Sequence, residues 1–319
     1  MIKIIPYRSE FYNRWNNFID QSLNGTLFHR LDFLEYHGEK FKQEEHHLMI
    51  LKGEEIIGVL PAVKRDNTLV SPYGSSFGGI VISKKCSLSN AISVANVLKE
   101  YFIKFGLKRV EIVAPPNHYY IEQNHNLSFA LEKIGFKLVS SEVFNFIELP
   151  KTEIEFWEDK YQPRGRTTYR KYKSNFSIHA NVSLDDFYPI LLEDKIRHNS
   201  SPTHSKAELN YLINNFPDKI WFDIAIHLNG SRIGICYFKP TSNTLLTFYM
   251  AQEISALGLN GKNILVDYGI RKAINEGIKF FDFGASTLAY DIQNIGVANF
   301  KESFGAIGAL RKKYILTIN

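Results

Sequence analysis

A lysine near the end of the chain stands in an aromatic frame. Lys301 lies in the segment FKESFG at 300–305, between apolar rings and close to a glycine. A strand-like segment that ends near Asp282 and a glycine turn at Gly284 precede it. An ammonium group in such surroundings can stabilise a developing oxyanion or hold a phosphate. The same spacing also fits an i, i+4 core pair of the two phenylalanines, with the lysine directed to water.

A second candidate is a basic run. The ten residues from Arg164 to Lys173 (RGRTTYRKYK) include five basic side chains and no acid. Arg164, Arg166 and Arg170, with tyrosines between them, can form a bidentate anion clamp, although charge runs are also typical of a solvated helix face. The net charge of the whole chain is only +5, which is too mild for a protein that coats nucleic acid. We therefore expect a phosphate-bearing ligand and no DNA.

A glycine-bearing loop offers a further anion site. After a predicted strand that contains Tyr249, the chain reads QEISALGLNGKN from Gln252 onward, with glycines at Gly258 and Gly261. Backbone amides in this loop can cradle a phosphate at the N-terminus of the following helix, and a pair of turn glycines explains the pattern equally well. We assign Gln252, Gly258 and Gly261 to cofactor binding, and Tyr249 and His198 to substrate binding.

Composition and missing motifs exclude several classes of protein. With 45% hydrophobic and 22% charged residues, the chain has the composition of a folded, core-forming protein. No window approaches the ~18 apolar residues of a spanning helix, and no signal-peptide pattern develops at the N-terminus, so we expect a cytoplasmic protein. Cys86 and Cys236 are interpreted as buried thiols in a reducing compartment. No metal-ligand spacing, G-x-S-x-G elbow or P-loop occurs, which predicts that no metal is bound.

The elements that must position these residues repeat once along the chain. The first half shows two strands, a glycine-rich stretch, a helix, a strand, a helix and two strands, at 47–52, 55–63, 71–82, 88–105, 108–114, 126–134, 136–140 and 142–149. The second half shows two helices, three strands, a helix and a strand, at 184–197, 205–215, 220–228, 233–240, 244–252, 264–275 and 279–283. This order predicts an α/β protein of two tandem units that divide near Pro150, with a ligand cleft between them.

Over essentially its whole length the chain resembles the Fem-type amino-acid ligases and their relatives, the tandem acyltransferases built from two GNAT units. The resemblance is carried by the strand and glycine at 281–284, FKESFGA at 300–306, the basic run, and IIGVLPAV with the glycine stretch that follows it. It implies an α/β (α+β) fold of two GNAT-like units, each a mixed, mostly antiparallel sheet flanked by helices. Residues 1–150, completed by 310–319, would form the first unit, and 151–309 the second. The resemblance also implies that Lys301 lies near the reacting acyl carbonyl in the cleft.

Two features depart from that family. Fem-type ligases often insert a long helical hairpin into the second unit, whereas residues 205–216 predict one short helix, which removes the feature most associated with a charged tRNA as donor. The pyrophosphate loop of coenzyme-A-dependent GNAT enzymes is also degraded, because Gly258 and Gly261 are not at the expected offsets.

These observations lead us to expect an N-acyltransferase. It would move an acyl or aminoacyl group from an acyl-CoA or acyl-carrier donor to the amine of a small molecule or sugar nucleotide, such as an amino sugar or a precursor in cell-envelope or polysaccharide biosynthesis. Lys301 would stabilise the oxyanion or leaving group, Phe300 would contact substrate, and Asp282 or a backbone carbonyl would accept the proton, with Glu302 a weaker candidate. Two alternatives remain open: an aminoacyl-tRNA-dependent Fem-type peptidyltransferase, and a noncatalytic scaffold that binds sugar nucleotides or an acyl carrier protein.

Overall fold

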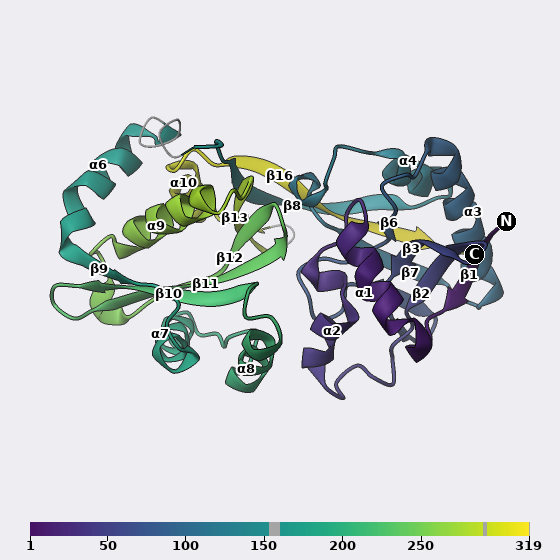
Figure 1. Cartoon of the computed structure of the whole chain (residues 1–319), viewed down its shortest axis with the longest axis horizontal. Helices are drawn as coiled ribbons and strands as arrows, with labels where there is room; N and C mark the ends of the chain where they lie inside the picture. Colours follow the sequence, from purple (N-terminus) through teal and green to yellow (C-terminus); the bar gives the residue numbers. More distant parts are fainter. Residues whose placement is uncertain (153–159, 290–291, 319) are drawn as a thin grey trace. The chain divides into compact units, whose positions relative to one another are not determined.

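The computed structural model describes residues 1–152, 160–289 and 292–318, which form two compact units (Figure 1). Unit 1 contains Met1–Val143 and the C-terminal segment from Ala309 onward, and unit 2 contains Phe144–Leu288 and Ile292–Gly308. Each unit combines helices with mixed, mostly antiparallel strands. The predicted fold class is therefore confirmed.

Unit 1 is built on two sheets. Its elements are β1 (Ile2–Pro6), α1 (Tyr12–Gln21), α2 (Leu31–Leu34), β2 (Leu48–Lys52), β3 (Glu55–Leu60), β4 (Val63–Arg65), β5 (Thr68–Ser71), β6 (Val81–Ile82), α3 (Leu88–Lys104), β7 (Arg109–Ala114), α4 (Asn126–Lys133) and the start of β8 (Lys137–Glu148). Strands β1, β2, β3 and β6 form one sheet in that order. In the other sheet β4, β5 and β7 are followed by β16 (Ile307–Thr317) and β8.

The sheet of β1, β2, β3 and β6 separates two hydrophobic cores. Leu48 and Ile50 of β2 pack in the core that includes Leu98 of α3, whereas the alternating Met49 packs with Trp15 of α1. Successive side chains of a strand point to opposite faces, so the apolar run of β2 buries both faces of this sheet. Helices α1 and α2 therefore belong to one core, and α3 and α4 to the other.

The C-terminal strand β16 is an interior strand of unit 1. It pairs antiparallel with β7, with Tyr314 opposite Ile112, and it lies between β7 and β8 in strand order. Tyr314 and Leu316 are buried in the same core as α3. The guanidinium of Arg311 donates from Nε to Glu142 Oε2 at 2.6 Å and from Nη1 to the carbonyl of Ser76. Unit 1 thus depends on a segment that is remote in sequence.

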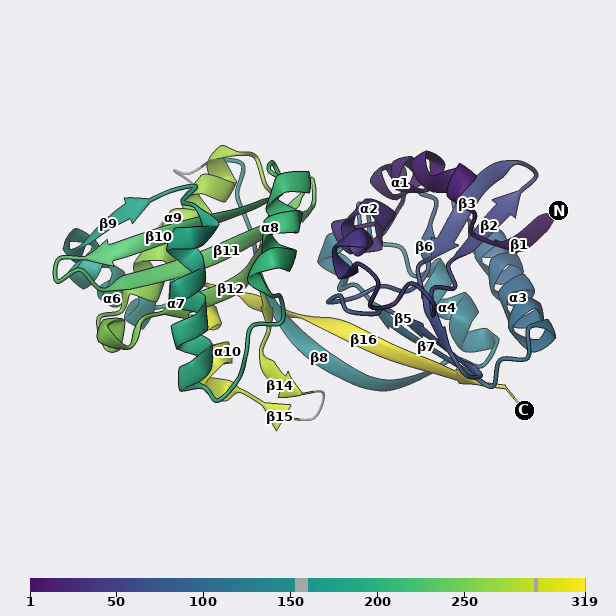
Figure 2. The ribbon, with the colours of Figure 1, turned by 90° about the horizontal axis from the view of Figure 1, so that it is seen from below.

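Unit 2 is a sheet with helices on both faces. Its elements are α6 (Pro163–Tyr172), β9 (Phe176–His179), α7 (Leu184–Arg197), α8 (Lys206–Asn215), β10 (Ile220–His227), β11 (Arg232–Thr241), β12 (Thr244–Gln252), α9 (Gly261–Asn275), β13 (Phe280–Ala285) and α10 (Ile295–Glu302). The strand order is β8-β13-β12-β11-β10-β9, and β12 and β13 form the parallel pair of this sheet. Helices α6 and α9 cover one face and α7 and α8 the other, with α7 lying across β10 to β12 (Figures 1 and 2). The short strands β14 (Thr287–Ala289) and β15 (Ile292–Gln293) pair between β13 and α10.

Two boundaries differ from the sequence-based prediction. The strands predicted at 136–140 and 142–149 are one continuous strand, β8, because no glycine or proline interrupts the chain at Ser140-Ser141. Helix α9 begins at Gly261 rather than at residue 264. The prediction also missed β1, α1, β9 and α10.

Candidate active site in unit 2

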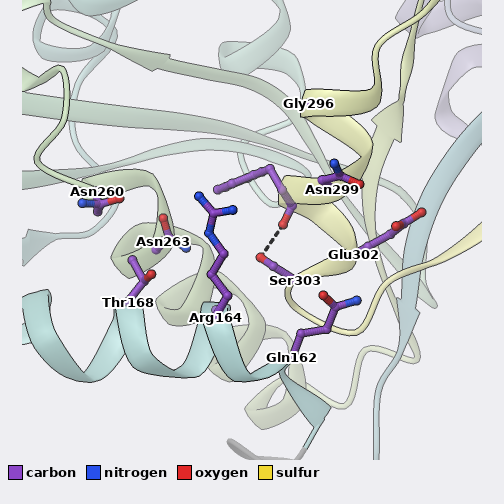
Figure 3. A pocket seen from close by; sticks show the side chains of 11 residues that line it. Gln162, Arg164, Thr168, Asn260, Asn263, Gly296, Asn299, Glu302 and Ser303 are labelled. Atoms are coloured by element: carbon purple, nitrogen blue, oxygen red, sulfur yellow. Dashed lines mark hydrogen bonds between the residues drawn. The ribbon is translucent and has the colours of Figure 1, made fainter.

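The site is a pocket of about 490 Å³ within unit 2, where three helices meet. Its lining comes from the first turns of α6, the start of α9 and one side of α10 (Figure 3). Most of the lining side chains carry an amide, a hydroxyl or a charge: Gln162, Arg164, Gly165, Thr168, Asn260, Asn263, Gly296, Asn299, Phe300, Glu302 and Ser303. The pocket is therefore polar, with Phe300 as its aromatic surface.

Close backbone contact fixes α6 against the end of α10. The amide of Gln162 donates to the carbonyl of Ser303 at 3.0 Å. A Cβ atom at Gly165 would lie 2.5 Å from the same carbonyl oxygen, a distance that only glycine permits. Proline at the first position of α6, Pro163, starts the helix directly after this contact.

Two features of the pocket attract an anion, whereas the carboxylate of Glu302, which also lines it, opposes them. Neither α6 nor α9 has a side-chain cap at its N-terminus, so N–H groups of both first turns lack an intrahelical acceptor. Pro163 has no N–H, and the N–H of Asn263 donates to the carbonyl of Asn260 at 3.1 Å. Asn260, which precedes α9, has φ +61°, and its side chain donates to the carbonyl of Gly258 instead of capping the helix. Arg164 extends from α6 toward Asn263 and α10 (Figure 3). A guanidinium beside two helix N-termini favours an anion.

The three arginines of the basic run do not converge on this pocket. Arg164 and Thr168, four residues apart, line it together. Arg166 is rotated by about 200° on the helix, and its Nη2 donates to the carbonyl of Tyr161 at 3.3 Å. Arg170 lies on the same side of α6 as Arg166, four residues further on. The structure therefore brings one of the three predicted clamp residues to the pocket.

A buried polar network holds α6 against α9. Asp267 of α9 accepts a hydrogen bond from the hydroxyl of Tyr161 at 2.9 Å and contacts Arg271 Nε at 3.3 Å. Tyr169 of α6 also hydrogen-bonds to this carboxylate. Burial raises the pKa of Asp267 to about 6. Because α6 and α9 both contribute to the pocket, this network positions its two uncapped helix N-termini.

Lys301 faces away from the pocket, toward the end of β13. Its side chain is 6% exposed, and Nζ donates to the carbonyls of Gly284 and Ala285 at 2.9 and 2.6 Å. Burial lowers the pKa of Lys301 to about 8, and the nearby Asp282 carboxylate partly opposes that shift. An ammonium has three N–H donors, so within the described part of the chain one remains for a further acceptor.

Asp282 is fully buried in β13. Its Oδ1 accepts the N–H of Gly284 at 2.6 Å, and Gly284 has φ +71°. The carboxylate therefore shapes the glycine turn whose carbonyl receives Lys301. This placement favours a positioning role, and the assignment of Asp282 as general base stays a prediction.

Strands β12 and β13 separate beside this turn. They pair from Thr244 to Leu246 on β12, whereas β12 itself continues to Gln252. On the opposite side, the register of β12 with β11 shifts between Thr247 and Tyr249, which makes Phe248 an inserted bulge residue. Bulges and diverging strands leave backbone N–H and C=O groups without a ladder partner. Such groups can pair with the amides of an extended ligand.

The remaining predicted residues are dispersed. Phe300 lines the pocket. Tyr249 is buried, with its hydroxyl 2.8 Å from Nδ1 of His204, and His198 is exposed beside Arg197. In the loop before α9, Gly258 has φ +80° and open space around it, whereas Gly261 packs against Ile233 and Phe176. The N–H of Gln252 faces Asp194 Oδ1 at 3.3 Å.

Sequence reasoning missed the side-chain amides of the pocket. Asn260 and Asn263 flank the start of α9, and Asn299 lies on α10 (Figure 3). The segment GLNGKN contains two of them, so the signal was present, but it was interpreted through its glycines alone.

Solved structures with the same fold place the chain in a structural class. It matches a crystal structure of FemX with a TM-score of 0.72 at 10% identity, covering 99% of this chain and 98% of that one. L-PGS from Bacillus licheniformis gives 0.59 at 12% identity, with 98% and 92% covered. A tandem GNAT protein from the clavulanic acid biosynthesis pathway gives 0.54 at 7% identity, with 99% and 98% covered. The chain therefore has a FemAB-like tandem GNAT fold.

At the level of sequence, no family model and no curated protein matches the chain. Across residues 1–152, 160–289 and 292–318, no helix is both long and apolar enough to cross a membrane. Within the same residues, no three His, Cys, Asp or Glu side chains are grouped so that they could hold a metal ion.

Proposed function

We propose that this protein is an N-acyltransferase whose acyl donor is linked to a phosphate-bearing carrier. The observation that carries the proposal is the pocket of unit 2, in which Arg164 and the uncapped N-termini of α6 and α9 meet. An anionic carrier such as coenzyme A matches these donors. The FemAB-like tandem GNAT fold supports the same class of reaction.

The proposed reaction is aminolysis of the donor. The nitrogen of the acceptor amine attacks the carbonyl carbon, a C–N bond forms, and the carbonyl oxygen takes the electron pair as an oxyanion. Collapse of the oxyanion breaks the C–S or C–O bond to the carrier. The proton released by nitrogen passes through a base to the departing sulfur or oxygen. Lys301 is proposed to stabilise the oxyanion with its third N–H, and Asp282 keeps the turn that orients this ammonium.

The separation of β12 from β13 supports an extended donor arm. Among the described residues the ladder of β12 with β13 ends at Leu246, and the edge of β12 beyond that point can hydrogen-bond to amides of such an arm. The ammonium of Lys301 lies at the corresponding end of β13. These features support placing the acyl end of the donor beside this part of β13.

The nature of the donor is tested by identifying what the protein binds. Purified protein is denatured, and the released small molecules and nucleic acid are analysed by mass spectrometry. A pantetheine species supports the proposal, and recovered RNA supports an aminoacyl-tRNA-dependent transferase. A sugar nucleotide without turnover when acyl-CoA and amines are added would contradict catalysis and favour a binding scaffold.

The pocket predicts different roles for the arginines of α6. Arg164→Ala should weaken the binding of coenzyme A by about 1–3 kcal/mol, the range for charge-assisted hydrogen bonds, and Arg164→Lys should restore only part of it. Added salt should weaken binding to the unsubstituted protein. Arg170→Ala removes the same charge from another side of the helix and should change binding by less than ~0.5 kcal/mol. Isothermal titration with coenzyme A measures the affinity of the three variants. Equal losses of affinity for Arg164→Ala and Arg170→Ala would contradict the assignment of Arg164 to the anion site.

A further inference from the structure

Unit 1 contains a pocket whose lining is acidic. It has a volume of about 390 Å³ and lies among the segments that surround α1 and α2 and precede β2. Its lining consists of two tyrosines, two leucines, a glycine, three glutamates, a lysine and a histidine: Tyr7, Tyr12, Leu31, Leu34, Glu35, Gly38, Glu39, Lys42, Glu45 and His47. None of these residues belongs to the pocket of unit 2.

Carboxylates outnumber cations around this pocket. Lys42, the lysine of the lining, forms an ion pair with Glu39, with Nζ 2.7 Å from Oε1. His47 is buried, and burial lowers its pKa to about 4, so its imidazole is neutral at pH 7. Glu35 and Glu45 therefore leave the lining with an excess of two negative charges.

One of these carboxylates lies beside a buried imidazole. Glu45 Oε2 lies 3.8 Å from Nε2 of His47, and the hydroxyl of Tyr73 lies 3.4 Å from the same nitrogen. The amide of Ala62 donates to Nδ1 of His47 at 3.2 Å, which fixes the imidazole. The carboxylate of Glu45 therefore lies next to a fixed, neutral ring.

Aromatic and apolar surfaces form the rest of the wall. The Tyr7 ring packs edge-on against Trp15 with a centroid distance of 5.6 Å, and it lies 6.0 Å from the His47 ring. Tyr12 and Leu31 add an aromatic and an aliphatic surface. Aromatic faces attract ammonium groups, and the aliphatic side chains accept an apolar body.

The spacing of the carboxylates argues against a metal ion. In the described parts of the chain no three His, Cys, Asp or Glu side chains are grouped so that they could hold a metal ion, so at most two of the three glutamates can meet one cation. The volume also exceeds the needs of a single ion. A larger cation with delocalised or shielded charge satisfies both observations.

We propose that the pocket of unit 1 binds an organic ammonium ion, an amine that carries an apolar or aromatic body. Glu35 and Glu45 receive the ammonium group, and Tyr7, Tyr12 and the two leucines contact the body. This binding does not depend on the acyl transfer proposed for unit 2.

The test is isothermal titration of the full chain with benzylammonium, and with benzyl alcohol as its neutral counterpart. Benzylammonium should bind at least about tenfold more tightly than benzyl alcohol, and added salt should reduce its affinity. The double variant Glu35→Gln/Glu45→Gln should lose at least about tenfold in affinity, and Tyr12→Leu should lose severalfold. Glu54→Gln, which makes the same charge change in the turn between β2 and β3, should bind as the unsubstituted protein does.

Three results would overturn the proposal. The first is that benzyl alcohol and benzylammonium bind with equal affinity. The second is that the double variant and Tyr12→Leu both bind benzylammonium as tightly as the unsubstituted protein, while both variants keep its melting temperature. The third is that Ca²⁺ displaces benzylammonium at a lower concentration than Na⁺, which acts only by screening. That result would identify a site for an inorganic cation.

Discussion

Removal of residues 310–319 should abolish the cooperative unfolding of unit 1. The deletion takes out most of β16, which lies between β7 and β8, and with it the buried side chains of Tyr314, Leu316 and Ile318. At about 1.5–3 kcal/mol for each large buried side chain, the loss is comparable to the whole stability of a typical domain. Hydrogen exchange should show lost protection in β7, and limited proteolysis should cut within residues 1–143.

Single substitutions separate this effect from a general defect. Leu316→Ala should lower the free energy of unfolding by about 2–5 kcal/mol, whereas its exposed neighbour Thr317→Ala should change it by less than ~0.5 kcal/mol. A truncated chain that unfolds at the same temperature as the full chain, with β7 still protected, would refute the interior position of β16.

Replacement of Lys301 should have the largest effect on catalysis. Lys301→Ala and Lys301→Met should each lower kcat/KM by about tenfold to a hundredfold, as expected when a transition-state contact is removed. The methionine variant keeps the volume and removes the charge, so it isolates electrostatics from packing. We expect a small change in melting temperature, because the cost of burying the ammonium offsets its two hydrogen bonds. Full activity in the methionine variant would mean that the ammonium does not act on the reaction.

The lowered pKa of Lys301 also predicts two pH dependences. If the ammonium form is required, kcat/KM should fall as the pH rises through about 8. For stability the sign is opposite. Between about pH 8 and the usual lysine pKa of about 10.5, the unfolded chain binds more protons than the folded one. The stability of the unsubstituted protein relative to Lys301→Met should therefore increase with pH across this window, which denaturation at several pH values measures.

The elements could be predicted where local signals agreed. Helix α3 was predicted at 88–105 and spans Leu88–Lys104, because its apolar spacing and terminal glycine point to the same boundary. The hairpin between β10 and β11 follows from Asn229-Gly230. Helix α1 was missed because its asparagines are weak helix formers, and the packing of Trp15 in the core outweighs that propensity.

The candidate sites were less predictable, because they depend on tertiary contacts. The basic run was recognised, but only the helical rotation of α6 separates Arg164 from Arg166 and Arg170. The burial of Lys301 requires the carbonyls of Gly284 and Ala285, which no local pattern reveals. The glutamates of the pocket in unit 1 follow no helical or strand period, since Glu35 lies in a short 3-10 helix, Glu39 in a turn and Glu45 in an isolated β-bridge.

The interior position of β16 has a consequence for protein synthesis. The strands β5 and β7 of unit 1 leave the ribosome long before β16, with residues 144–308 translated in between. At ~5–20 residues per second this interval is on the order of ten seconds or more. During that time β7 presents an open strand edge, the kind of surface that promotes association between chains. The nascent chain should therefore be most prone to aggregation, and most dependent on chaperones, while unit 2 is being made.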